Sequence, residues 1–167
     1  TAMPLVTMTY DAENRMSQAT HSLNGTESYS YDPAGRRVLK LLPPPCQGCV
    51  DFRVYFYGVD GALLRTYGTS EGYNVYFAGK LIWEQASGGP GSVVPDRLGS
   101  VGAKYFPYGQ EATQTNNDRT KFATYHRDQT TTLDYARNRY YSSTLARFTS
   151  PDPAEPGDPT NPQSFNY

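Results

Sequence analysis

The sequence has 167 residues, is rich in tyrosine and is nearly neutral. Its 15 Lys and Arg face 16 Asp and Glu, a net charge of −1, so no basic field attracts nucleic acid or an anionic membrane. No apolar run approaches the roughly 18 residues of a membrane-spanning helix. The 15 Tyr and 7 Phe, with 15 Gly and 13 Pro, favour an all-β protein of short strands and tight turns.

A self-match near the amino terminus predicts two successive β-hairpins. Residues 8–15 align with residues 29–36, and each unit has Tyr-Asp, two further residues, Asn or Gly, and then Arg. Aspartate opens a turn, and Asn or Gly tolerates the left-handed backbone that the turn needs. The repeat motif comprises Tyr10, Asp11 and Arg15 in the first unit and Tyr31, Asp32, Gly35 and Arg36 in the second.

Two weaker hairpins follow along the chain. Residues 52–57 and 63–67 flank a turn at 59–61, and residues 74–77 and 80–84 flank a turn at 78–79. Together these hairpins predict a β-meander over residues 1–86. The prolines at 43–45 are expected to interrupt it as a strand-free crossing, and the glycine-rich stretch 87–91 is expected to break it again.

Residues 87–167 are predicted to form a second part of the same continuous β structure. Residues 112–119 are polar and are expected to form an exposed loop. Aromatic and polar residues alternate over 120–150, which predicts short strands, with one helical turn near 135–140 as an alternative. The five prolines of 151–162 exclude a central strand and predict an irregular closing region.

This ordered series of motifs resembles the RHS/YD-repeat family, which includes bacterial polymorphic toxins, the C component of insecticidal toxin complexes, and teneurins. The Tyr-Asp units match the repeat signature, and the carboxyl half is similar to the RHS repeat-associated core region. Thr124, Thr132 and Ala146 stand where that region usually has glycine, so we expect altered or strained turns there. The residues that carry the core resemblance are Gly99, Pro107, Gly109, Arg127, Asp128, Tyr135, Arg139, Tyr140, Phe148 and Pro153.

The resemblance implies antiparallel hairpin repeats that form part of a spiralling β-sheet shell. In toxin members of the family this shell encloses a C-terminal toxin. The implied partners are therefore the neighbouring YD repeats of the same polypeptide and a C-terminal toxin cargo, and the implied location is secreted or on the cell surface. Open strand edges also favour self-association. We expect no cofactor.

Asp152 is the sharpest catalytic candidate. The resemblance implies an aspartyl-type self-cleaving site that uses this residue and a second aspartate downstream, with Arg147 as a charge partner. Paired carboxylates can activate water on a peptide bond. The second aspartate would lie beyond Tyr167, so the site is incomplete in this sequence. The alternative is that Asp152 is a turn or capping acid before Pro153.

Cys46 and Cys49 have half the spacing of a zinc ribbon. A structural zinc site needs four ligands, and the sequence has no second cysteine pair. A disulfide, or two free thiols on an exposed loop, is therefore favoured over a metal site.

Two further groups have a functional and a structural interpretation. His126, Arg127, Asp128 and Asp134 form either an acid–base cluster or salt-bridged turn residues, and we favour the second. The tyrosines form either a glycan-binding face or packing between strands, and packing is the simpler explanation. We therefore expect a structural protein rather than an enzyme.

Overall fold

The computed structural model describes residues 6–69, 71–86, 89–151 and 160. Apart from one 3-10 turn (Phe122–Thr124), all regular elements in these ranges are β-strands. Nine strands form one antiparallel sheet in sequence order, and five shorter strands form a second antiparallel sheet. The predicted all-β class is confirmed.

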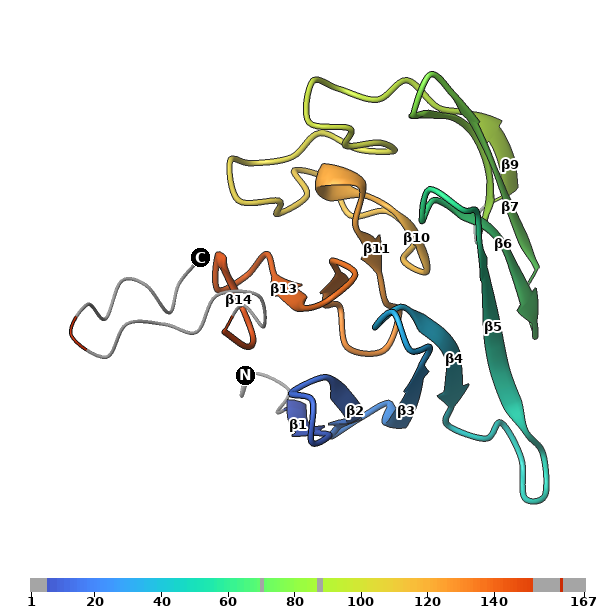
Figure 1. Cartoon of the computed structure of the whole chain (residues 1–167), viewed down its shortest axis with the longest axis vertical. Helices are drawn as coiled ribbons and strands as arrows, with labels where there is room; N and C mark the ends of the chain where they lie inside the picture. The colour runs from blue at the N-terminus through green and yellow to red at the C-terminus, as the bar shows by residue number, and fades with distance from the viewer. Residues whose placement is uncertain (1–5, 70, 87–88, 152–159, 161–167) are drawn as a thin grey trace.

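The nine-stranded sheet is a continuous meander. Its strands are β1 (Val6–Tyr10), β2 (Met16–His21), β3 (Gly25–Tyr31), β4 (Arg37–Leu42), β5 (Asp51–Tyr57), β6 (Leu63–Gly68), β7 (Gly72–Phe77), β8 (Lys80–Ala86) and β9 (Gly89–Ser92). The second sheet consists of β10 (Arg119–Thr120), β11 (His126–Arg127), β12 (Asp134–Tyr135), β13 (Tyr140–Ser142) and β14 (Arg147–Phe148). Figure 1 shows that the large sheet curves, and that β10–β14 lie on its concave side.

The two Tyr-Asp units occupy equivalent places on neighbouring hairpins. Oδ1 of Asp32 accepts hydrogen bonds from the backbone N–H groups of Ala34 (2.9 Å) and Arg36 (2.8 Å), and Oδ1 of Asp11 accepts the two matching bonds in its own turn. The residue before the arginine has a left-handed backbone, with φ of 60° at Asn14 and 76° at Gly35. Each arginine side chain then returns to its aspartate. The motif thus builds the turn from its own side chains.

The same five-residue turn occurs at three further places, 58–62, 96–100 and 106–110. In each, the first N–H donates to the fifth carbonyl and the fourth N–H donates to the first carbonyl. The fourth residue is always glycine with φ of 82–84° (Gly61, Gly99 and Gly109). Only Asp96 repeats the aspartate bonds, at 2.8 Å to both Leu98 and Ser100. The Asp-to-Gly spacing at 96–99 is the sequence signal for this extra turn.

A β-bulge follows the turn in each of four hairpins, between β1 and β2, β3 and β4, β5 and β6, and β7 and β8. On β4, for example, Leu39 pairs with Ser30 but Arg37 pairs with Tyr31, so one residue is unpaired. A bulge shifts the alternation of faces by one residue. Arg37 and Lys40, three residues apart, are therefore both buried.

Tyrosine hydroxyls join successive hairpins. Each donates to the backbone carbonyl of the residue that directly follows the turn of the preceding hairpin, so one hairpin is bonded to the next. The three bonds run from Tyr31 to Met16 (2.6 Å), from Tyr57 to Arg37 (2.8 Å) and from Tyr76 to Leu63 (3.1 Å). Burying tyrosine in this way keeps its hydroxyl satisfied.

Two local predictions were wrong. The prolines do not interrupt the meander, because the loop 43–50 is long enough to return and Leu42 pairs with Asp51. The glycine-rich stretch does not break the sheet either, since residues 89–92 form β9, an outer strand on which proline is tolerated. The short strands predicted within 120–150 are confirmed, because β12 and β13 occupy the place where a helical turn near 135–140 was the alternative. The boundary between residues 86 and 87 stays a prediction.

The three positions at which glycine was expected all have a left-handed backbone. The φ angles are 69° at Thr124, 59° at Thr132 and 56° at Ala146. A side chain with a Cβ costs about 1 kcal/mol in this conformation relative to glycine. The expected strain is therefore present at all three turns.

Candidate functional site

The concave face of the large sheet carries charged side chains. Glu27 on β3, Arg37 and Lys40 on β4, and Arg53 on β5 are buried there. Unpaired charges in such a place would be very costly. Their partners come from the carboxyl half, which lies on this face of the sheet (Figure 1).

Arg37 and Asp128 form the centre of this group. The two guanidinium nitrogens Nη1 and Nη2 donate to Asp128 Oδ2 and Oδ1 at 2.6 and 3.0 Å, and both side chains are 0% exposed. Nη1 also donates to the Tyr140 hydroxyl (3.0 Å), and the Arg37 backbone N–H donates to the Tyr135 hydroxyl (2.7 Å). A bidentate arginine–carboxylate pair fixes orientation as well as distance.

Four tyrosine rings surround the Arg37 guanidinium. Cations over aromatic faces are attracted by the ring quadrupole, more strongly where water is excluded. The distances from the guanidinium carbon to the ring centres are 4.4 Å for Tyr135, 4.7 Å for Tyr55, 5.4 Å for Tyr29 and 5.8 Å for Tyr140. Two of these rings come from the large sheet and two from β12 and β13.

Lys40 extends the cluster. Its Nζ lies 3.1 Å from Asp118 Oδ1, 3.2 Å from Asp128 Oδ1 and 3.4 Å from Glu27 Oε1. Arg53 Nη1 lies 3.2 Å from Asp118 Oδ1. We name this group the ionic cluster: Glu27, Arg37, Lys40, Arg53, Asp118 and Asp128. Its three cations and three carboxylates balance.

The charges shift the pKa values of the cluster. Burial alone would raise the pKa of Asp128, but Arg37 and Lys40 outweigh it and hold that pKa below its usual value. Burial would lower the pKa of Lys40, but the neighbouring carboxylates, Asp128 first, raise it. Burial lowers the pKa of His126 to about 3, so this imidazole is neutral. Every cluster member whose pKa shifts is thus held in its charged form.

Three side chains could together hold a metal ion: those of Asp118, His126 and Asp128. Each offers one ligand atom, and these three atoms lie within 4.8 Å of one another. Both ring nitrogens of His126 are buried without a hydrogen-bond partner among the described residues. However, Lys40 and Arg37 already neutralise both carboxylates. A divalent cation would add two positive charges to a balanced, buried group, which is strongly unfavourable. The arrangement therefore suits internal ion pairs better than metal binding.

Further ion pairs lie within the carboxyl half or join it to the large sheet. Arg127 donates to both oxygens of Asp134 at 2.7 and 2.6 Å, and Lys121 Nζ lies 2.8 Å from Glu111. Arg119 Nη2 on β10 lies 2.8 Å from Glu84 on β8, which again joins the carboxyl half to the large sheet. Most of these charged groups are buried, and each lies within reach of an opposite charge.

Five of the ten residues of the core motif take part in this packing. Asp128, Tyr135 and Tyr140 meet at Arg37, and the Gly109 carbonyl accepts a 3.0 Å bond from Arg127. Gly99, Pro107 and Arg139 lie in turns, and Phe148 lies on the outer strand β14. A Cβ at Gly99 would lie 2.5 Å from Thr124, Pro107 is exposed in a turn, and the Arg139 guanidinium lies 3.7 Å from the ring centre of Phe148.

Of the two candidate catalytic residues, Arg147 and Asp152, the structure describes only Arg147. Arg147 is exposed on β14, where its backbone pairs with Ser142. Asp152 and Pro153 lie outside the described residues. The self-cleavage hypothesis stays a prediction, as does glycan binding.

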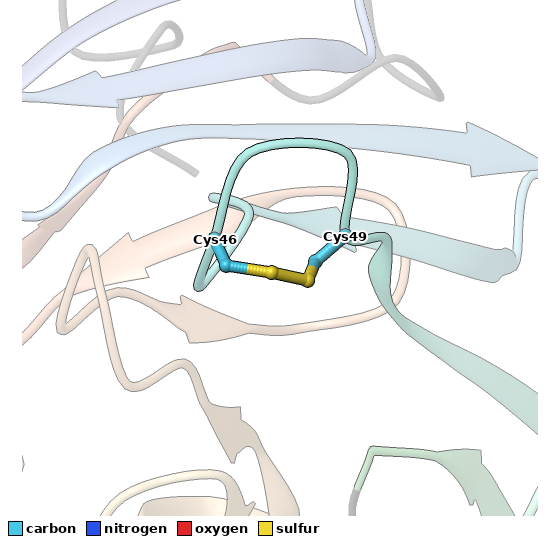
Figure 2. The surroundings of a disulfide bond; sticks show 2 residues. All are labelled: Cys46 and Cys49. Carbon is cyan, nitrogen blue, oxygen red and sulfur yellow. A yellow bond between two sulfur atoms is a disulfide. The ribbon is translucent and has the colours of Figure 1, made fainter.

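The cysteines are joined to each other. Figure 2 shows the disulfide between Cys46 and Cys49, within the loop 43–50 that connects β4 to β5. Cys46 is exposed. The bond closes a small ring at the rim of the sheet and does not touch the ionic cluster.

Sequence reasoning missed five members of the ionic cluster: Glu27, Arg37, Lys40, Arg53 and Asp118. Asp118 was predicted in an exposed loop, but its side chain is only 9% exposed and pairs with Lys40 and Arg53. Strict alternation places Arg37 and Lys40 on opposite faces, and only the bulge brings them together. The available signal was the presence of two cations in a strand otherwise formed by Val and Leu.

Comparison with known proteins places the fold. No family model matches the chain, and no curated protein does. Among solved structures, the chain is similar to the TcdB2-TccC3 crystal structure (TM-score 0.57, 17% identity, 89% of this chain covered). It is also similar to TcdB2-TccC3 without its hypervariable C-terminal region (0.60, 18%, 89%) and to the Photorhabdus luminescens Tc holotoxin pore (0.62, 18%, 97%).

The match establishes a Tc/RHS-like β fold for this chain. The chain spans 9% of the length of each of these structures' matched chains. Among its described residues, no helix is long and apolar enough to cross a membrane.

Proposed function

We propose that this chain is part of the wall of a hollow β-sheet shell, and that its carboxyl half closes the wall over a C-terminal toxin cargo. The role is structural, and the chain acts together with the neighbouring YD repeats of a longer, exported polypeptide. Successive hairpins are joined by tyrosine hydroxyl bonds, and each has a β-bulge directly after its turn. Such hairpins suit a curved sheet, because bulges increase the bend and twist of a strand. One of the similar structures is described as lacking a hypervariable C-terminal region, which fits a variable cargo after a constant wall.

The observation that carries the proposal is the Arg37–Asp128 pair at 2.6 Å. It joins β4 of the curved sheet to the segment after β11, and the two residues are 91 positions apart in the sequence. A buried bidentate pair is directional and costly to break. The carboxyl half is therefore fixed on the concave face, where a closing segment of a shell must lie.

Limited proteolysis of the whole polypeptide tests this role. We expect the enclosed C-terminal cargo to resist protease in the wild-type protein. In Asp128→Asn we expect it to be cut, because the carboxyl half of this chain is held less firmly on the sheet. Glu71→Gln removes one partner of an exposed ion pair and is the matched control. Equal cutting of wild type and Asp128→Asn at equal folded fraction would show that these contacts do not close a cage.

A further inference from the structure

A cavity of about 390 Å³ lies between the large sheet and the carboxyl half, beside the turns at 32–36, 58–62 and 78–79. This volume falls within the range of pockets that hold small ligands. Both halves of the chain contribute to its lining. Tyr57 and Tyr76 come from the large sheet, and Tyr125, Tyr135 and Arg137 come from the carboxyl half.

Tyrosine rings give the cavity aromatic walls. Their hydroxyls are largely used elsewhere, since Tyr57 and Tyr76 donate to backbone carbonyls and Tyr135 accepts from the Arg37 N–H. Burial raises the pKa of each lining tyrosine, so the walls are uncharged at neutral pH. A ligand in the cavity therefore meets uncharged aromatic side chains, which pack well against another aromatic group.

Arg137 supplies a free positive charge. Three acidic or basic residues besides His126 line the cavity: Arg36, Asp60 and Arg137. Arg36 is paired with Asp32 (2.8 Å), and Asp60 accepts only a neutral backbone N–H (3.0 Å), so a carboxylate ligand must sit nearer to Arg137 than to Asp60. The described residues supply no hydrogen bond or ion pair to the guanidinium of Arg137. Its backbone is left-handed (φ 66°), and its Nη2 would lie 3.2 Å from a Cβ placed on Gly61. Glycine at position 61 thus leaves the room in which this guanidinium lies.

We propose that this cavity binds an aromatic ring that carries a carboxylate. The tyrosine rings hold the aromatic group, and Arg137 pairs with the carboxylate. Such chemistry occurs in a free aromatic acid and in a peptide segment where an acidic residue follows an aromatic one. This site does not depend on the proposed shell function, since it is formed within the chain itself.

Calorimetric titration with 3-phenylpropionate tests the proposal, with phenethylamine as the ligand of opposite charge. We expect the acid to bind with a dissociation constant of about 1 mM or tighter, and the amine to bind at least about 10-fold more weakly. Arg137→Gly should weaken binding of the acid by about 10-fold, because a charged hydrogen-bonded pair is lost. Glycine suits the φ of 66° better than arginine does, so this variant keeps its fold.

Arg97→Ala is the matched control, since Arg97 is an exposed arginine in the turn 96–100, outside the cavity. It should bind 3-phenylpropionate like the wild type. A capped peptide that contains Phe-Glu, compared with one that contains Phe-Gln, distinguishes the two sources. Tighter binding of the Phe-Glu peptide than of the free acid indicates a polypeptide ligand, and the reverse indicates a small molecule. Three results would each overturn the proposal. They are equal affinity for the acid and the amine, an unchanged affinity for the acid in Arg137→Gly, and no detectable binding of either the acid or the Phe-Glu peptide.

Discussion

Asp128→Asn should be the most damaging conservative change in this chain. The substitution keeps the shape of the side chain and the backbone bonds of the turn, but it removes the charge that faces Arg37 and Lys40. Both Arg37 and Asp128 are 0% exposed, so water cannot solvate the cations left behind. Breaking one side of a buried ion pair costs about 3–5 kcal/mol. We expect a loss of that size in the free energy of unfolding.

Urea unfolding followed by Trp83 fluorescence and far-ultraviolet circular dichroism measures this loss. Glu71→Gln serves as control, because its partner Arg65 lies 3.4 Å away and both side chains are more than 40% exposed. An exposed pair contributes less than about 1 kcal/mol. The double variant Arg37→Met with Asp128→Asn restores charge balance and should recover at least about 1 kcal/mol relative to Asp128→Asn. If Asp128→Asn costs no more than Glu71→Gln, the ionic cluster does not hold the two halves together.

Three further predictions concern single side chains. The pKa of His126 is about 3 in the folded protein and about 6.5 when exposed, so the unfolded state gains a proton first as the pH falls. Stability should therefore decrease from pH 6.5 downward, by roughly 2–3 kcal/mol at pH 4.5, and His126→Phe should remove this part of the pH dependence in urea titrations. Thr132→Gly should raise the melting temperature, because it relieves about 1 kcal/mol of strain at φ 59°. Tyr57→Phe should cost about 1 kcal/mol by removing the bond to the Arg37 carbonyl, whereas Tyr73→Phe, which loses only an exposed bond, should cost close to nothing in the same assay.

The hairpins could be predicted because their signals are local. Asp32 and Gly35 specify a turn through bonds that span four residues, and the strands beside them alternate as expected. The same reasoning located β5 to β8 from short aromatic runs and turn residues. The strain at Thr132 could also be predicted, because the resemblance places a glycine at this position and a left-handed backbone is strained for any residue with a Cβ.

The ionic cluster could not be predicted, because its partners are far apart in sequence. Lys40 and Asp118 are 78 positions apart, and Lys40 and Asp128 are 88 apart. Their burial also depends on a bulge that reverses the alternation within β4, and a bulge leaves little mark on composition. A strand with Arg37 and Lys40 among apolar residues suggests an outer face for the charges, whereas here the charges face inward.

Electron cryomicroscopy of the complete polypeptide would test the proposed architecture most directly. The account predicts a hollow particle in which β1–β9 form part of the wall, with the ionic cluster and β10–β14 directed toward the enclosed space. A solid particle, or one in which the concave face of this sheet points to bulk solvent, would contradict it.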